Sequence, residues 1–190
     1  MKAVFNELET HPVIAAVRES AHVNAALDSP VRMIFLMGGS LSELEAITRK
    51  ARRADKKIMI HIELVKGLGR DCEGVEYLAE VVRPDGMVST KPQLIKEASK
   101  LGLATVLQIF LIDTQAYLTG LKNIASTKPD ALEIMPGLMP RVINTLSTDF
   151  DIPVITAGLV KQPDEVKLML AAGAAGIAIS EQSLWSYSPE

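Results

Sequence analysis

Charged side chains follow several short apolar runs of this sequence, and their types suit a small phosphorylated polyol. Arg18 and Lys91 each come just after such a run and could hold an anion. Glu63 and Glu133 lie at or near the ends of two others, and their carboxylates could accept hydrogen bonds from hydroxyl groups. The alternative is that these four residues form structural ion pairs, because an unpaired buried carboxylate is costly.

Residues 152–181 could supply the backbone of a phosphate site. Gly158 follows the apolar run 154–156, and Ser180 closes the run 176–180 before a short final helical segment. Pro163 can open a helix between these two runs, and Gly173 can end it. This order predicts parallel strands joined by a right-handed crossover. Glycine backbone and N–H groups at a helix start are suited to binding phosphate.

The elements that would position these residues alternate along the whole chain. Buried strands are expected at residues 13–17, 32–37, 57–63, 86–89, 104–112, 131–134, 154–156 and 176–180. Helical segments are expected between and after them, with caps at Ser40, at Thr90 and at Asp113 or Thr114. Eight such units favour a compact (β/α)₈ TIM-type barrel with parallel strands over an open doubly wound sheet.

The barrel is predicted to be one domain over residues 1–190, with residues 1–11 as an N-terminal extension. The chain is shorter than the ~250 residues typical of this fold, so its loops must be short. Functional residues of such barrels collect at the carboxyl ends of the strands. Within 57–63, three isoleucines alternate with Met59, His61 and Glu63; the isoleucines suit the helix side, which places His61 and Glu63 on the inner face.

Composition limits the classes of function. A net charge of −3 excludes a broadly basic nucleic-acid-binding protein but permits a local patch. One basic run, consisting of Arg49, Arg52, Arg53 and Lys56, is a candidate RNA contact; the alternative is a solvated helix C-terminus. One cysteine, no signal-peptide pattern and no membrane-length apolar run together predict a cytoplasmic protein without a membrane partner.

Signatures of catalysis are absent from the sequence. It has no Gly-x-Ser-x-Gly, Walker or His-Glu-x-x-His pattern, and no predicted strand carries an interior lysine for a Schiff base. We therefore expect neither a cofactor nor a metal ion. The remaining enzyme hypothesis is an isomerase, lyase or phosphodiesterase acting on a small phosphorylated substrate, with Glu63 as the base. That hypothesis rests on analogy with other barrels.

Seven segments in order carry a family resemblance over residues 12–185. They are PVIAAVR from Pro12, HIELVKGLG from His61, PDGMVSTK from Pro84, IFLID from Ile109, PDALEIMPG from Pro129, PVITAGLV from Pro153, and SLW from Ser183. Together they resemble the glycerol uptake operon antiterminators, which are glycerol-3-phosphate-responsive regulators. The resemblance implies a compact barrel that senses glycerol 3-phosphate and binds leader mRNA to prevent transcription termination. It does not imply an enzyme or an oligomeric state.

The sequence departs from the family pattern at three positions. Glu63 stands where the pattern has aspartate, Gln108 replaces a strand-five arginine, and Glu181 follows Ser180 where the pattern has asparagine. Glu181 would place a negative charge beside the expected phosphate site, where it would oppose anion binding. These departures raise the alternative that the effector is a related small polyol phosphate.

Overall fold

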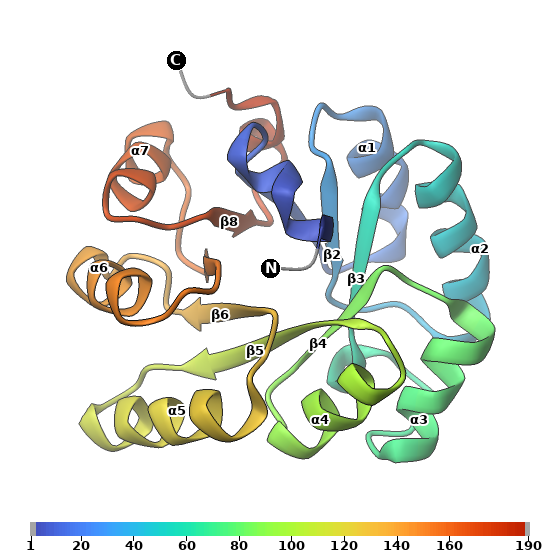
Figure 1. The fold of residues 1–190 in the computed structure, drawn as a ribbon. Helices are drawn as coiled ribbons and strands as arrows, with labels where there is room; N and C mark the ends of the chain where they lie inside the picture. The colour runs from blue at the N-terminus through green and yellow to red at the C-terminus, as the bar shows by residue number, and fades with distance from the viewer. Residues whose placement is uncertain (1–2, 189–190) are drawn as a thin grey trace.

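A computed structural model, which describes residues 3–188, contains a closed barrel of eight parallel strands. The strands pair in sequence order, and β8 closes the barrel against β1 (Figure 1). This confirms the predicted (β/α)₈ barrel. The strands are β1 (Val13–Val17), β2 (Met33–Leu36), β3 (Lys57–His61), β4 (Gly86–Ser89), β5 (Ala104–Phe110), β6 (Ala131–Met135), β7 (Val154–Ala157) and β8 (Gly176–Ile179).

Helices surround the barrel, as Figure 1 shows. The α-helices are α1 (Val23–Asp28), α2 (Leu41–Arg53), α3 (Cys72–Tyr77), α4 (Pro92–Lys100), α5 (Thr114–Thr127), α6 (Pro140–Asp149) and α7 (Pro163–Ala171). Shorter helical turns are η1 (Ala3–Glu9), η2 (Ser20–His22), η3 (Ile62–Leu64), η4 (Leu78–Val82) and η5 (Gln182–Ser186). None of the helices among residues 3–188 has both the length and the apolar character needed to span a membrane.

Local sequence signals explain where most helices begin. Ser40 caps α2 as predicted, and it forms a capping box with Glu43. Asp113 caps α5 by accepting a hydrogen bond from the backbone N–H of Ala116 at 2.7 Å. The prediction that Thr90 caps the next helix is wrong: the cap position of α4 belongs to Lys91, and Pro92 opens the helix. The backbone N–H of Thr90 instead donates to Glu63.

Strand β3 is shorter than predicted, and this changes the position of Glu63. The strand ends at His61, and the chain turns into η3 with Glu63 at its centre. Alternating residue types continue through the turn, so the pattern gives no sign of the strand end. In the turn, the Glu63 carboxylate accepts hydrogen bonds from Ser89 Oγ and Thr90 N at the end of β4. Strand β5 likewise ends at Phe110, two residues before the predicted end.

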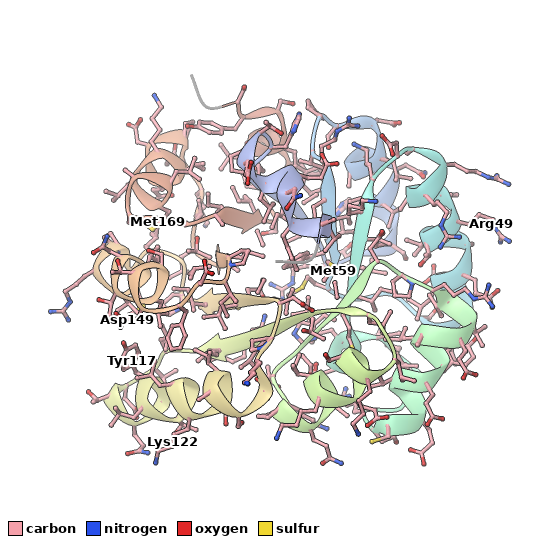
Figure 2. All side chains as sticks on the ribbon, in the orientation of Figure 1. Arg49, Met59, Tyr117, Lys122, Asp149 and Met169 are labelled. Carbon is pink, nitrogen blue, oxygen red and sulfur yellow. The ribbon has the colours of Figure 1, made fainter. Side chains whose placement is uncertain are left out.

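Apolar side chains fill the amino-terminal half of the barrel interior. Phe5 and Leu8 of η1 are buried there against Ile14, Phe35 and Met59. Figure 1 shows η1, in blue, lying across the middle of the barrel, and Figure 2 places Met59 near the same centre. Because side chains fill this half, the barrel interior has space for a ligand only toward the carboxyl ends of the strands.

The packing of η1 generates a stability prediction. Phe5→Ala should lower the free energy of unfolding by about 3–5 kcal/mol, because the truncation leaves a cavity in the barrel floor. Urea denaturation measures the change, with Asn6→Ala, an exposed position of the same helix, as the matched control. A loss under about 1 kcal/mol for Phe5→Ala would mean that η1 is not part of the cooperative core.

Candidate ligand-binding site

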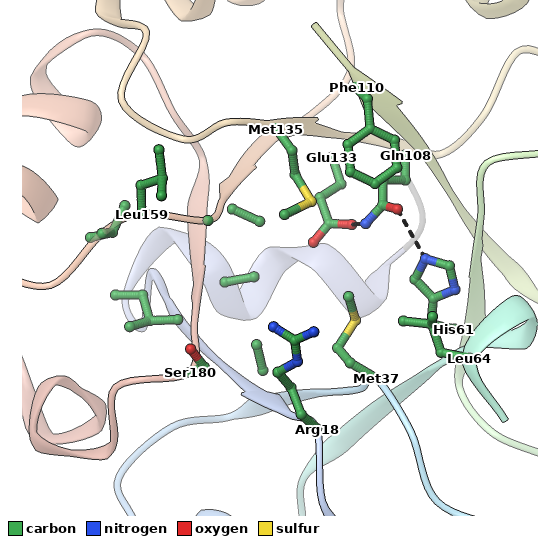
Figure 3. Close-up of a pocket in the computed structure, with 16 residues that line it drawn as sticks. Arg18, Met37, His61, Leu64, Gln108, Phe110, Glu133, Met135, Leu159 and Ser180 are labelled. Carbon is green, nitrogen blue, oxygen red and sulfur yellow. Dashed lines mark hydrogen bonds between the residues drawn. The ribbon is translucent and has the colours of Figure 1, made fainter. Parts of the chain in front are cut away.

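A cavity of about 320 Å³ opens at the carboxyl ends of the strands (Figure 3). Its polar side chains are Arg18, His61, Gln108, Glu133 and Ser180. Most of the remaining lining is apolar and includes Met37, Leu64, Phe110, Met135 and Leu159. An apolar hollow with a few convergent polar groups is the usual form of a small-molecule site.

Arg18 supplies a positive charge at the cavity. It follows β1 directly, and Figure 3 shows its guanidinium turned toward the cavity. The side chain is exposed and makes no ion pair or hydrogen bond with another side chain in the part of the chain that the structure describes. Gly38 allows the close approach of the neighbouring loop, because a Cβ there would lie 2.2 Å from the Arg18 carbonyl oxygen. The guanidinium is thus free to bind an anion.

The turn after β7 lies on the cavity wall near the end of β8. Gly158 has φ +84°, and Leu159 has φ +67°, a conformation uncommon for a residue with a side chain. The Gly158 carbonyl accepts a hydrogen bond from the backbone N–H of Gly137 at 3.0 Å. The turn thereby brings glycine backbone to the cavity, and the hydroxyl of exposed Ser180 lines it from the end of β8.

A chain of polar side chains crosses the barrel interior beneath this cavity. Oε2 of Glu63 lies 3.1 Å from Nδ1 of His61, and Nε2 of His61 lies 3.0 Å from Oε1 of Gln108. Nε2 of Gln108 donates to Oε2 of Glu133 at 2.5 Å. Figure 3 shows the side chains of His61, Gln108 and Glu133 pointing toward one another. We call the four residues Glu63, His61, Gln108 and Glu133 the polar chain.

The charges along the polar chain are set by burial and by the neighbours. Burial lowers the pKa of His61, but hydrogen bonds to Glu63 and Gln108 outweigh it, and the pKa is raised overall. Burial raises the pKa of Glu63, but hydrogen bonds from His61 and Ser89 outweigh it and lower the pKa overall. The structure therefore favours an imidazolium–carboxylate pair at this end.

Glu133 forms the other end and has a different electrostatic environment. Its side chain is fully buried, and burial raises its pKa to about 7, although the hydrogen bond from Gln108 and the charge of His61 oppose the rise. Among the described residues, Oε1 of this carboxyl group has no hydrogen-bond partner. A buried acceptor without a partner is costly, so a donor from a ligand would stabilise it.

The structure brings together four of the six residues predicted to bind a ligand. Arg18, Gly158, Ser180 and Glu133 line one cavity. Glu63 does not line it, because its carboxylate is held by the end of β4 and by His61.

Lys91 also lies elsewhere. Nζ of Lys91 donates to the Arg70 carbonyl oxygen at 2.9 Å, and the residue lines a separate groove with Asp71 and Cys72. Glu181 is exposed and accepts a hydrogen bond from Ser183, and it does not line the cavity.

Sequence reasoning missed the apolar wall of the cavity. Met37, Phe110 and Met135 lie at the carboxyl ends of their strands, in register with other inward-facing residues. The alternation of inward and outward positions along each strand was the signal that could have found them.

Two residues of the predicted basic run bind backbone carbonyl oxygens of the protein, and two are exposed. Lys56 is buried, and its ammonium group donates to the carbonyl oxygens of Ser29 and Val31. Burial also lowers its pKa. Its role is therefore to hold the loop before β2, which corrects its expected availability to RNA. Arg52 donates to the Arg83 carbonyl oxygen at 2.9 Å.

Arg49 and Arg53 of the same run are exposed on α2. Figure 2 shows Arg49 pointing away from the barrel. The end of α2 lies at the amino-terminal end of β3, whereas the cavity lies at the carboxyl ends of the strands. The basic run and the cavity are therefore at opposite ends of the barrel.

Comparison with known proteins decides the family. The model of the family described as "Glycerol-3-phosphate responsive antiterminator" matches residues 13–185. The chain belongs to this antiterminator family. The match includes every residue of the polar chain and all of the cavity lining.

Similar proteins agree with the family assignment. An antiterminator regulatory protein of the glycerol uptake operon from Listeria monocytogenes has a solved structure with a TM-score of 0.87. It is 28% identical, and the match covers 91% of this chain and 94% of that one. The structure of a glycerol uptake operon antiterminator-related protein from Thermotoga maritima matches at 24% identity, with a TM-score of 0.82 and coverage of 94% and 99%, and at this identity the likeness shows the fold alone.

The Escherichia coli protein YgcP, described as uncharacterized, is 29% identical over 94% of both chains. Barrel enzymes such as an aldolase match at 12–16% identity, and these similarities show the fold alone. Within residues 3–188 there is no group of three or more His, Cys, Asp or Glu side chains that could hold a metal ion.

The electrostatic environment of Glu133 generates a pH prediction. Its pKa in the folded protein is about 7, against an ordinary value of 4.5, so the folded state binds the proton more tightly between these pH values. The protonated carboxyl group therefore contributes fully to the free energy of unfolding at pH values below 4.5, its ordinary pKa. This contribution is lost as the pH rises through 7. The expected loss between pH 5 and pH 8 is about 2–3 kcal/mol.

Glu133→Gln isolates this effect, because the amide has nearly the same shape and does not titrate. Urea denaturation at pH 5 and pH 8 should give a larger loss of unfolding free energy for the unmodified protein than for the variant. Parallel pH profiles of the two proteins would contradict the assignment of a raised pKa to Glu133.

Proposed function

We propose that this protein is a transcription antiterminator that senses glycerol 3-phosphate, or a related small polyol phosphate, and binds leader mRNA. The observation that carries the proposal is the cavity itself. It is lined by Arg18 and by the buried Glu133, and neither the guanidinium nor Oε1 of that carboxyl group has a side-chain partner among residues 3–188. Family membership supplies the regulatory context. An mRNA partner implies that the protein works in the cytoplasm.

The phosphate group of the effector would lie between Arg18 and the turn that contains Gly158. A guanidinium matches phosphate geometry because it can donate two parallel hydrogen bonds. The Ser180 hydroxyl is placed to donate a further bond from the end of β8. Barrels of this class often bind phosphate at the loops after strands seven and eight, which supports this placement.

The hydroxyl end of the effector would point into the cavity toward Glu133. Its unpaired Oε1 would accept a hydrogen bond from a ligand hydroxyl and so satisfy a buried acceptor. A cavity of about 320 Å³ is near the lower limit for ligand pockets, which suits an effector of only a few carbons. Glu63 would act on the effector only through the polar chain.

The RNA surface would lie at the opposite end of the barrel, with Arg49 and Arg53 of α2 as phosphate contacts. A few such contacts give salt-sensitive binding. Effector binding can alter RNA binding only if the effector has different affinities for two states of the protein. We infer a regulator without turnover, because the family is regulatory and the cavity needs no chemical step to bind its effector.

The first functional prediction concerns the effector. Calorimetric titration with glycerol 3-phosphate should show binding, and Arg18→Gln should weaken it by about 10–100-fold, the equivalent of one charged hydrogen bond. Lys91→Gln removes the same charge outside the cavity and should leave the affinity unchanged. Equal losses for both variants would refute the placement of the phosphate, and absence of binding to the unmodified protein would refute the effector.

The second functional prediction concerns RNA. In fluorescence anisotropy with labelled leader RNA, Arg49→Glu combined with Arg53→Glu should weaken binding, and the salt dependence should fall by about two phosphate contacts. The matched control is Lys122→Glu with Lys167→Glu, which changes net charge equally on α5 and α7. If the control pair weakens binding as much as the α2 pair, the proposed surface is wrong.

A further inference from the structure

The hydrogen bonds of the polar chain have one direction. Glu133 Oε2 accepts from the amide nitrogen of Gln108, so the amide oxygen of Gln108 must accept from Nε2 of His61. The other ring nitrogen of His61 faces the Glu63 carboxylate at 3.1 Å. A doubly protonated imidazole satisfies both neighbours. Both N–H groups of His61 then face an acceptor on the protein, and one of the two N–H groups of Gln108 is used by Glu133.

One oxygen of the Glu133 carboxyl group has neither a hydrogen bond nor a charged partner among the described residues. This oxygen, Oε1, is buried without a hydrogen bond to any residue that the structure describes, and Glu133 lines the cavity. The Gln108 amide donates to the neighbouring oxygen, Oε2, and no donor of the described residues reaches Oε1. A hydrogen-bond donor on a ligand in the cavity would satisfy this oxygen.

We propose that the polar chain makes this cavity select a ligand that presents a hydrogen-bond donor to Oε1 of Glu133, and reject a similar ligand that presents a carboxylate. The selected class is a phosphate monoester with a hydroxyl at the far end. The rejected class is its oxidised counterpart, a phosphorylated hydroxy acid. This inference rests on the proposed function, because it concerns the other end of the same effector.

Few other charged or titratable groups lie near Glu133, which supports the assignment of ligand selection to this carboxyl group. Arg18 and His61 are the other charged or titratable side chains that line the cavity, from the end of β1 and from β3. Gln108 of β5 separates His61 from Glu133, and Glu63 lies beyond His61. The described residues of β2, β7 and β8 that line the cavity carry no titratable side chain.

Selection should depend on pH. Burial raises the pKa of Glu133 to about 7, so near pH 6 the carboxyl group holds a proton that it can donate to a ligand carboxylate. Near pH 8 it has lost that proton and repels the carboxylate. Glu63 and Gln108 act as positioning residues: Glu63 keeps a positive charge on His61, and Gln108 fixes which oxygen of Glu133 faces the ligand.

The test compares glycerol 3-phosphate with 3-phosphoglycerate by calorimetry at pH 6 and pH 8. The ratio of the two dissociation constants is the readout, because titration of the phosphate group affects both ligands alike. The unmodified protein should prefer glycerol 3-phosphate, and its preference should grow about tenfold or more between the two pH values. Glu133→Gln should keep the fold and abolish this growth.

Glu63→Gln tests the positioning role. Loss of the carboxylate removes the positive charge from His61, and that charge lowers the pKa of Glu133. The pH at which the preference changes should therefore move upward in this variant, which a purely structural role would not cause. Glu76→Gln, at an exposed position of α3, is the matched control and should leave the profile unchanged.

The outcomes separate this inference from the proposed function. If both ligands bind and their ratio is the same at pH 6 and pH 8, the inference is overturned and the proposed effector stands. If the preference changes with pH but does so equally in Glu133→Gln, the selecting group is not Glu133 and the inference is likewise overturned. If neither ligand binds at either pH, the proposed function fails and the inference fails with it.

Discussion

The pairing register between β5 and β6 is the constraint on which the site depends. In this register Gln108 lies opposite Glu133, and both side chains face the barrel interior. A slip of one residue would turn Leu107 or Ile109 inward and send Gln108 to the helices. The hydrogen bond between the two side chains then orients Glu133, and His61 and Glu63 extend the same network to β3 and its following turn.

The two halves of the barrel interior have separate roles. Phe5, Phe35 and Met59 close the amino-terminal half with apolar packing, while the polar chain and Arg18 occupy the carboxyl half. Dispersion and hydrophobic burial stabilise the floor, so the mouth can tolerate a costly unpaired carboxyl oxygen. The same division places the cavity far from the exposed arginines of α2, so the proposed regulation would require a signal to pass along the barrel.

Much of this architecture could be predicted from the sequence, because eight apolar runs separated by capped helices allow few folds. The alternation within residues 57–63 correctly placed His61 inside, but it could not show that the chain turns before Glu63. Lys56 and Lys91 were grouped with free cations because charge alone does not reveal a backbone carbonyl within reach. Such contacts depend on loops that are distant in sequence, and periodicity carries no information about them.

The most direct test of the account is a crystal structure of the protein with glycerol 3-phosphate bound. We expect one ligand in the cavity of about 320 Å³, with its phosphate on Arg18 and the turn at Gly158, and a hydroxyl donating to Oε1 of Glu133. The polar chain should keep its hydrogen bonds. A ligand bound in the groove beside Lys91, or one whose phosphate faces Glu133, would contradict the account.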